Sequence, residues 1–214
     1  MRQPQSFAIA ALEQMLELLE ISNIQYSLSV TKITAAKDKT PGYIIASELD
    51  GFDRPVCFAF KELVDLTDGS EIQSNEIPVE QSINYKLTRD GLVYPTFYEG
   101  LETEIMEKFR SVTSEARADS RGIWAIDRTS GFTLWDTRTI QENVIILPKL
   151  FRRFVAFFLR RSDFDEFINY LKSNKDPVKL YDGTSSNLHE LLDHDDQYYG
   201  LPIKPEDLTF VPKK

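Results

Sequence analysis

The feature that most constrains the fold is an Asp-Gly turn between two apolar segments. Asp50 and Gly51 separate the apolar residues 43–49 from residues 54–60. Asp-Gly favours the tight turn of a β-hairpin, because glycine adopts the required positive φ without steric cost. The sequence therefore predicts two antiparallel strands here, more strongly than it predicts any other element.

An arginine follows this turn, although the hairpin itself does not require one. Arg54 lies between Asp53 and Pro55 at the start of the second strand. One interpretation is an ordinary solvated residue that pairs with Asp53 or Asp50. The other interpretation is that Arg54 meets an anionic ligand above the loop. The residue types alone leave both open.

Hydrophobic periodicity predicts the other elements. Apolar residues at helical spacing predict helices over residues 6–20, 79–92, 101–124, 147–161 and 163–174. Alternation predicts one strand over residues 24–33, with short strands at residues 132–136 and 143–149. Gly122 is expected to end the long helix, whose Glu and Arg residues are expected to be solvated. Trp124 is expected to pack back onto the fold, and the residues after 174 to form a polar, acidic tail.

Composition limits the class of protein. The chain has 214 residues, a formal net charge of -9 and one cysteine, Cys57, in an apolar run. A single cysteine excludes an internal disulfide framework and favours a small buried side chain. The acidic balance argues against a broad phosphate-binding face, although a local basic patch is compatible with it. No apolar run is long enough for a membrane span and no secretory signal is evident, so a cytoplasmic protein is expected.

Three motifs occur in the order and spacing of a known family. Residues 50–56 resemble an Asp-x-Tyr-Gly-Arg-x-Leu turn, and Asn84 with Leu87, Gly91 and Leu92 resembles a Val-Asn-x-x-Leu-x-x-x-Gly-Leu helix. Residues 115–117 with residues 122–124 resemble a final helix that ends in Gly-Ile-Trp. Over residues 5–125, the chain thus resembles the staphylococcal nuclease-like (thermonuclease) family.

The resemblance implies an α+β fold, in which helices pack on an OB-type barrel. Here the barrel is expected to be partial, with its first strands missing, because the chain begins at the segment that matches the family's first helix. The resemblance implies an incomplete nuclease-like domain over residues 1–125. Residues 126–214 are expected to form a family-type α/β extension that packs on the first part.

The resemblance also implies calcium-dependent hydrolysis of nucleic-acid phosphodiester bonds, with Arg54 at the scissile phosphate. A guanidinium suits this role because its paired donors match phosphate oxygens and stabilise developing charge. The family's Ca²⁺ ligands, its water-orienting glutamate and its second arginine lie on the strands expected to be missing. We therefore expect no metal site in this chain and no hydrolysis by the chain alone.

Three explanations of the missing strands stay open. The chain is a fragment of a longer nuclease-like protein, a shortened paralogue with a binding or scaffolding role, or a protein whose partner supplies strands. Open sheet edges favour pairing with another chain or self-association. A non-catalytic protein- or nucleic-acid-binding module is accordingly the alternative function.

Other residues are weaker candidates for substrate binding. Basic and aromatic residues interleave along residues 147–161, as in a phosphate-binding surface or in a helix with a Phe core face and a charged outer face. The candidates there are Lys149, Arg152 and Arg153, with Arg160 and Arg161 beside them, and Tyr94 and Tyr98 either stack a base or pack onto the fold. His189 and His194 are expected to belong to the solvated tail, because a spacing of five does not bring two helical side chains to one metal.

Overall fold

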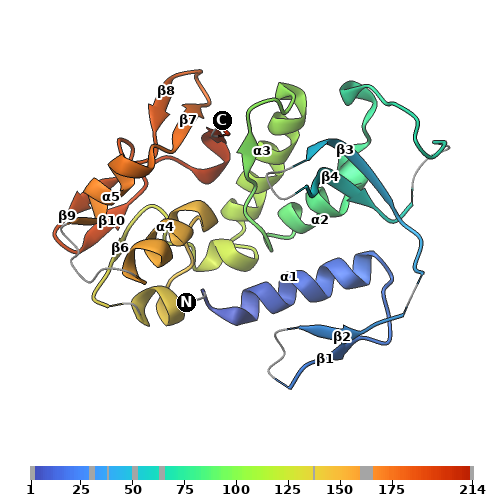
Figure 1. Ribbon diagram of the computed structural model, residues 1–214, viewed down its shortest axis with the longest axis horizontal. Coiled ribbons are helices and arrows are strands. Elements are labelled where there is room, and N and C mark those ends of the chain that lie inside the picture. Colours follow the sequence, from blue (N-terminus) through green and yellow to red (C-terminus); the bar gives the residue numbers. More distant parts are fainter. Residues whose placement is uncertain are drawn as a thin grey trace.

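The computed structural model describes residues 3–28, 32–37, 39–49, 53–62, 66–136, 138–159 and 166–212. Figure 1 shows a mixed α+β fold in which α3 lies between the β3–β4 hairpin and the sheets of the C-terminal part. The helices are α1 (Gln5–Leu18), α2 (Ile83–Arg89), α3 (Thr103–Ala118), α4 (Pro148–Phe158) and α5 (Phe167–Asn174). The strands are β1 (Gln25–Tyr26), β2 (Ile33–Ala35), β3 (Tyr43–Leu49), β4 (Pro55–Phe60), β5 (Phe97–Tyr98), β6 (Phe132–Thr133), β7 (Pro177–Leu180), β8 (Ser185–Asn187), β9 (Asp193–Asp195), β10 (Tyr198–Gly200) and β11 (Leu208–Phe210).

The hairpin predicted from the Asp-Gly turn is confirmed. Strands β3 and β4 pair antiparallel, with Ile45 opposite Phe58. Phe60, at the end of β4, is fully buried, and Phe58 stacks on Phe109 of α3 with the ring centroids 6.0 Å apart. The hairpin therefore rests on the helices through its aromatic residues, while the turn residues 50–52 lie outside the described part of the chain.

The single strand predicted over residues 24–33 is wrong. Strand β1 lies within this segment and pairs antiparallel with β2, which begins at its last residue, Ile33, and the Ser27 N–H donates to the Lys32 carbonyl at 2.9 Å. Alternating polarity is the same in one long strand and in a folded-back pair of short ones, so periodicity did not distinguish them.

The prediction of a solvated acidic tail is also wrong. The residues after α5 form strands β7 to β11, in a four-stranded sheet of order β5-β11-β7-β8 and a three-stranded sheet of order β6-β10-β9. Their inward side chains join the largest hydrophobic core with residues of α4 and α5; its fully buried members include Phe154, Phe157, Phe167, Tyr199, Leu208 and Phe210. His189 and His194 lie outside any helix, so the helical argument about their spacing does not apply.

The long helix ends earlier than predicted. Helix α3 ends at Ala118, and Gly122 begins a separate 3₁₀ turn, Gly122–Ala125. Trp124 in this turn is buried against Ala116, Ile123 and Ile145, as expected.

The predicted strand over residues 143–149 is reduced to one isolated bridge, between Ile145 and Asp127. A π-helical turn (Thr139–Asn143) precedes this bridge and α4 follows it, so no room is left for a longer strand.

Within the described residues, the strands form four separate sheets, none of which closes into a barrel. The α+β class is therefore established, and the barrel remains a proposal from the resemblance. The predicted ranges 1–125 and 126–214 share one sheet, because β5 pairs in parallel with β11. No helix in the described part of the chain is long and apolar enough to cross a membrane.

Candidate functional site

Arg54 lies at the start of the outgoing strand of the β3–β4 hairpin. Its side chain is exposed, and so is that of Asp53, whose φ of 58° belongs to the left-handed region. An exposed guanidinium beside a turn is accessible to an anionic ligand. The residue that the sequence singled out is thus on the surface, on an element that packs on helices.

Asn84 of α2 holds the hairpin in place. Its amide oxygen accepts a hydrogen bond from the Ala59 N–H at 3.0 Å, and its amide nitrogen donates to the Cys57 carbonyl at 3.3 Å. Both partners belong to β4, so one side chain satisfies two backbone groups on the strand edge that faces away from β3. Burial also raises the pKa of the Cys57 thiol, in keeping with a packed role for this side chain.

The two motif glycines join α2 to α3. Gly91 has a φ of 69°, and its carbonyl accepts a hydrogen bond from the Ile123 N–H at 2.8 Å. A Cβ at Gly91 would lie 2.4 Å from the Arg121 carbonyl oxygen, and one at Gly122 would lie 2.3 Å from the Gly91 oxygen. The backbones therefore meet at a distance that only glycine permits at these two positions.

A partly buried polar network, which the sequence did not predict, joins α3 to residues 127 and 206. Arg117 of α3 donates to both carboxylate oxygens of Glu206, at 3.3 and 2.6 Å, and to Asp127 at 3.2 Å. Its guanidinium carbon lies 4.0 Å from the centroid of the Trp124 ring. Glu206 is only 3% exposed, so this carboxylate depends on Arg117 for its charge balance.

Arg110, about two turns before Arg117 on α3, contacts the same C-terminal segment. Its Nε donates to the Glu206 backbone carbonyl at 2.8 Å, and its side chain is 11% exposed. The expectation that the arginines of this helix are solvated is therefore wrong for Arg110 and Arg117. Glu206, the partner that both arginines share, lies 96 and 89 residues later in the sequence, where no local pattern could reveal it.

Tyr94 belongs to this network. Its hydroxyl donates to Asp127 at 2.6 Å, and its ring packs edge-on against Trp124, with the centroids 5.0 Å apart. Burial, followed by the negative charge of Asp127, raises the pKa of Tyr94 well above its ordinary value. Of the two interpretations of Tyr94, these contacts favour packing over base stacking.

Tyr98 is more accessible than Tyr94. It lies on β5 with 37% of its surface exposed, and its ring contacts that of Phe210 at 6.2 Å. Tyr98 lies beside β11, whereas Arg54 lies on the β3–β4 hairpin, so the two residues belong to different sheets.

The basic residues of α4 are partly occupied by an internal carboxylate. Arg153 donates to both oxygens of Asp176 at 2.5 Å, and Lys149 lies 3.6 Å from the same group. Asp176 is 3% exposed, and its hydrogen bonds raise the pKa of Arg153. Arg152 is exposed, whereas Arg160 and Arg161 lie outside the described residues. Arg153 thus stabilises the fold, and Arg152 is the most accessible basic side chain described on α4.

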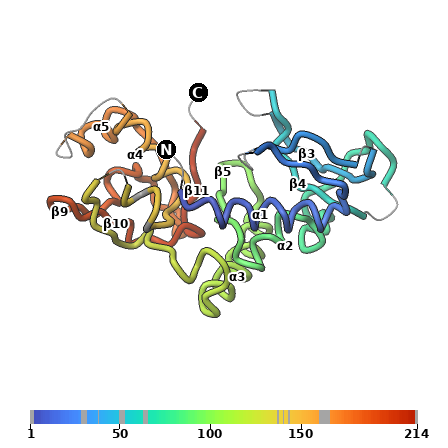
Figure 2. The backbone as a smooth tube through the Cα atoms, turned by 90° about the horizontal axis from the view of Figure 1, so that it is seen from below, coloured from blue at the N-terminus to red at the C-terminus, as the bar shows by residue number. Residues whose placement is uncertain are grey.

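The structure does not bring the predicted site residues together. Figures 1 and 2 show the β3–β4 hairpin and α4 to either side of α3. Arg54 therefore lies apart from Lys149, Arg152 and Arg153 of α4, and these residues do not form one site.

The calcium implied by the resemblance does not fit the described residues. Calcium prefers several hard oxygen ligands, with carboxylates among them. Across the ranges that the structure describes, no three His, Cys, Asp or Glu side chains lie close enough to hold a metal ion. Asp53 beside Arg54 is one carboxylate, which is not a Ca²⁺ site.

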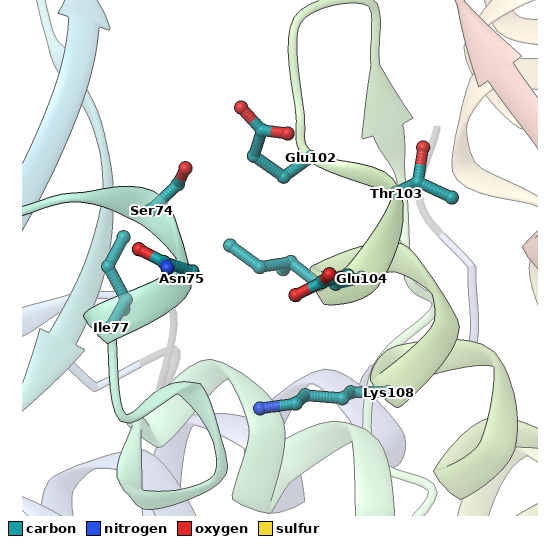
Figure 3. Close-up of a pocket in the computed structure, with 8 residues that line it drawn as sticks. Ser74, Asn75, Ile77, Glu102, Thr103, Glu104 and Lys108 are labelled. Atoms are coloured by element: carbon teal, nitrogen blue, oxygen red, sulfur yellow. The ribbon is translucent and has the colours of Figure 1, made fainter.

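One pocket of about 250 Å³ lies between the N-terminal end of α3 and the Ser74–Glu76 3₁₀ turn. Figure 3 shows Glu102, Glu104 and Lys108 on one side of it, with Ser74 and Asn75 opposite. Lys108 pairs with Glu80 at 2.7 Å, and this hydrogen bond lowers the pKa of Glu80. The pocket contains none of the predicted site residues.

Comparison with known proteins identifies no relative. No protein-family model matches the chain, and neither a curated protein nor a solved structure matches it.

Proposed function

We propose that this chain is a staphylococcal nuclease-like protein whose β3–β4 hairpin presents Arg54 to a phosphate of a nucleic acid. The exposure of Arg54, on a hairpin that Asn84 and Phe109 fix to two helices, is the observation that carries the proposal. A fixed support matters because a guanidinium binds phosphate through paired donors of defined geometry.

The proposed activity of the described residues is phosphate binding. Calcium-dependent hydrolysis, which the resemblance implies, needs in addition a set of carboxylates that the described residues do not form. In that reaction Arg54 would support the leaving group, and carboxylates from outside the described residues would complete the site.

The test combines binding and cleavage of labelled single-stranded DNA. Fluorescence anisotropy, with and without added Ca²⁺, measures affinity, while electrophoresis of the same samples measures cleavage. We expect Arg54→Ala to weaken binding about fivefold to tenfold, as for the loss of one charge-assisted contact. Arg54→Lys is expected to bind with intermediate affinity, because it keeps the charge but loses the paired donors.

Arg138→Ala is the matched control. Arg138 is another exposed arginine, 75% accessible and paired with Asp136 at 2.8 Å, outside the predicted site. Equal DNA affinity of Arg54→Ala and Arg138→Ala would refute the proposal. Cleavage in Ca²⁺ that Arg54→Ala abolishes would extend it from binding to catalysis.

A second candidate function is protein binding through β3. Within the described residues, β3 pairs only with β4, so its other edge is open. Tyr43, Ile44 and Leu49 are 48%, 58% and 61% exposed, which is unusual for apolar residues of a strand. Sedimentation velocity should then show self-association that Ile44→Lys reduces. A strictly monomeric wild-type chain with no DNA-independent protein partner would argue against this candidate.

A further inference from the structure

The outer face of the β6-β10-β9 sheet carries two exposed aromatic side chains. Burial alternates along β6 and the two residues that follow it. Phe132 and Leu134 are at most 6% exposed, whereas Trp135 is 72% exposed. The Leu134 N–H donates to the carbonyl of Gln197, the residue before β10, at 2.8 Å. The backbone pairing of β6 with β10 therefore extends to Leu134, the residue before Trp135. Trp135 therefore points outward at the end of this sheet.

Tyr198 of β10 lies on the same face and is 42% exposed. Its ring extends over two glycines, because a Cβ at Gly131 would lie 2.2 Å from the Tyr198 hydroxyl oxygen and one at Gly200 would lie 3.1 Å from it. The hydroxyl donates to the Ser130 carbonyl at 3.4 Å. The ring is thus supported by backbone and keeps one side toward solvent.

Two carboxylates flank this ring on the edge strand. Asp195 is directly opposite Tyr198, and Asp193 is directly opposite Gly200, so both share the outer face of the sheet with Tyr198. Both are exposed. We refer to Trp135, Tyr198, Asp193 and Asp195 as the aromatic–acidic face, which lies at the end of the molecule where Figures 1 and 2 show β9 and β10.

We propose that the aromatic–acidic face binds an arginine side chain from an extended segment of a partner protein. A cation over an aromatic ring is attracted by the π-electrons, and a carboxylate beside the ring adds an ion pair. Directly opposed residues on neighbouring strands have Cβ atoms about 5 Å apart, so one guanidinium reaches both Tyr198 and Asp195. Arginine fits better than lysine because its planar group stacks on rings while it donates paired hydrogen bonds.

The charges of this face determine the class of partner. Stacked bases would bring phosphates beside Asp193 and Asp195, whose like charge opposes a nucleic acid. The nearest basic residue in sequence, Arg138, is paired with Asp136. The face is therefore complementary to a cation, and this inference is independent of the function proposed for Arg54.

The test uses a short fluorescein-labelled peptide with arginines in an otherwise neutral sequence. Its binding to the full chain is measured by anisotropy at low and at physiological salt. The matched probe replaces each arginine by citrulline, which keeps the shape and loses the charge. We expect the arginine peptide to bind more tightly than the citrulline peptide, and added salt to weaken its binding.

Variants assign the binding to this face. Trp135→Ala and Asp195→Asn are expected to weaken it about fivefold to tenfold each, while Trp135→Phe, which keeps a ring, retains most of it. Asp68→Asn removes an equal charge from an exposed residue on another segment and is expected to leave the affinity unchanged. Equal affinity for both peptides, or equal loss in Asp68→Asn and Asp195→Asn, would overturn the proposal. Tighter binding of single-stranded DNA than of the peptide, lost in Trp135→Ala, would also overturn it.

Discussion

Gly91 and Gly122 determine how closely the segments that follow α2 and α3 approach each other. Their backbones approach so closely that a side chain at either position would meet a carbonyl oxygen. Both also have positive φ, at 69° and 52°. The sequence motif that contains them therefore has a structural explanation that does not depend on any ligand.

Gly91→Ala is expected to destabilise the protein more than Gly69→Ala. Gly69 has a φ of 79°, but a Cβ there has no atom within 4 Å, so it shares the strained backbone without the clash. We expect a cost of about 1 kcal/mol at Gly69 from conformation alone, and roughly 2 kcal/mol more at Gly91 from overpacking. Urea unfolding of the two variants measures this difference. Equal costs would show that the backbone at Arg121 moves aside.

At the scale of elements, the β3–β4 hairpin depends on α2 for its position. Two hydrogen bonds from Asn84 and the stacking of Phe58 on Phe109 connect it to the helices. A two-stranded hairpin alone is only marginally stable in water, so these contacts keep Arg54 at a defined place.

Asn84→Ala is expected to lower the free energy of unfolding by about 1–3 kcal/mol, since it leaves the Ala59 N–H and the Cys57 carbonyl without this partner. Asn75→Ala is the control, because Asn75 is an exposed asparagine of a surface turn. Amide hydrogen exchange at Ala59 provides a local measurement. Unchanged protection at Ala59 in Asn84→Ala would contradict the assigned role.

Elements differed in how well local sequence predicted them. The hairpin and helices α1, α3, α4 and α5 follow from the Asp-Gly turn and from helical periodicity, which act within a few residues. Strands β9, β10 and β11 have three residues each, too few to establish an alternating pattern. Many residues of this region are polar and acidic, which is why it resembled a solvated tail.

At the scale of the whole molecule, the two halves of the chain are joined by buried charges and by one shared sheet. Arg117 connects α3 with Asp127 and Glu206, and β5 pairs with β11. The division between residues 125 and 126 remains a prediction from the resemblance. The contacts across it indicate that both parts stabilise each other.

Arg117→Leu is expected to destabilise the protein by about 3–5 kcal/mol, because Glu206 then remains buried without its cation. The double variant Arg117→Leu with Glu206→Leu should recover part of this loss, which the loss of packing alone would not produce. Arg138→Leu, at an exposed ion pair, is expected to change stability by less than about 1 kcal/mol. Thermal unfolding in which the single and double variants are equally destabilised would contradict the importance of the unpaired charge.

The sequence by itself determined the main helices and the hairpin that carries Arg54, because each depends on the pattern of a short segment; the α+β class was expected from the resemblance. Only the tertiary structure decided that Arg117 and Arg153 are occupied by Glu206 and Asp176, and that Tyr94 binds Asp127. It also decided that Trp135 and Tyr198 share a face with two carboxylates. The physical reason is that burial and pairing of a charged side chain depend on residues distant in sequence, which folding alone brings into contact.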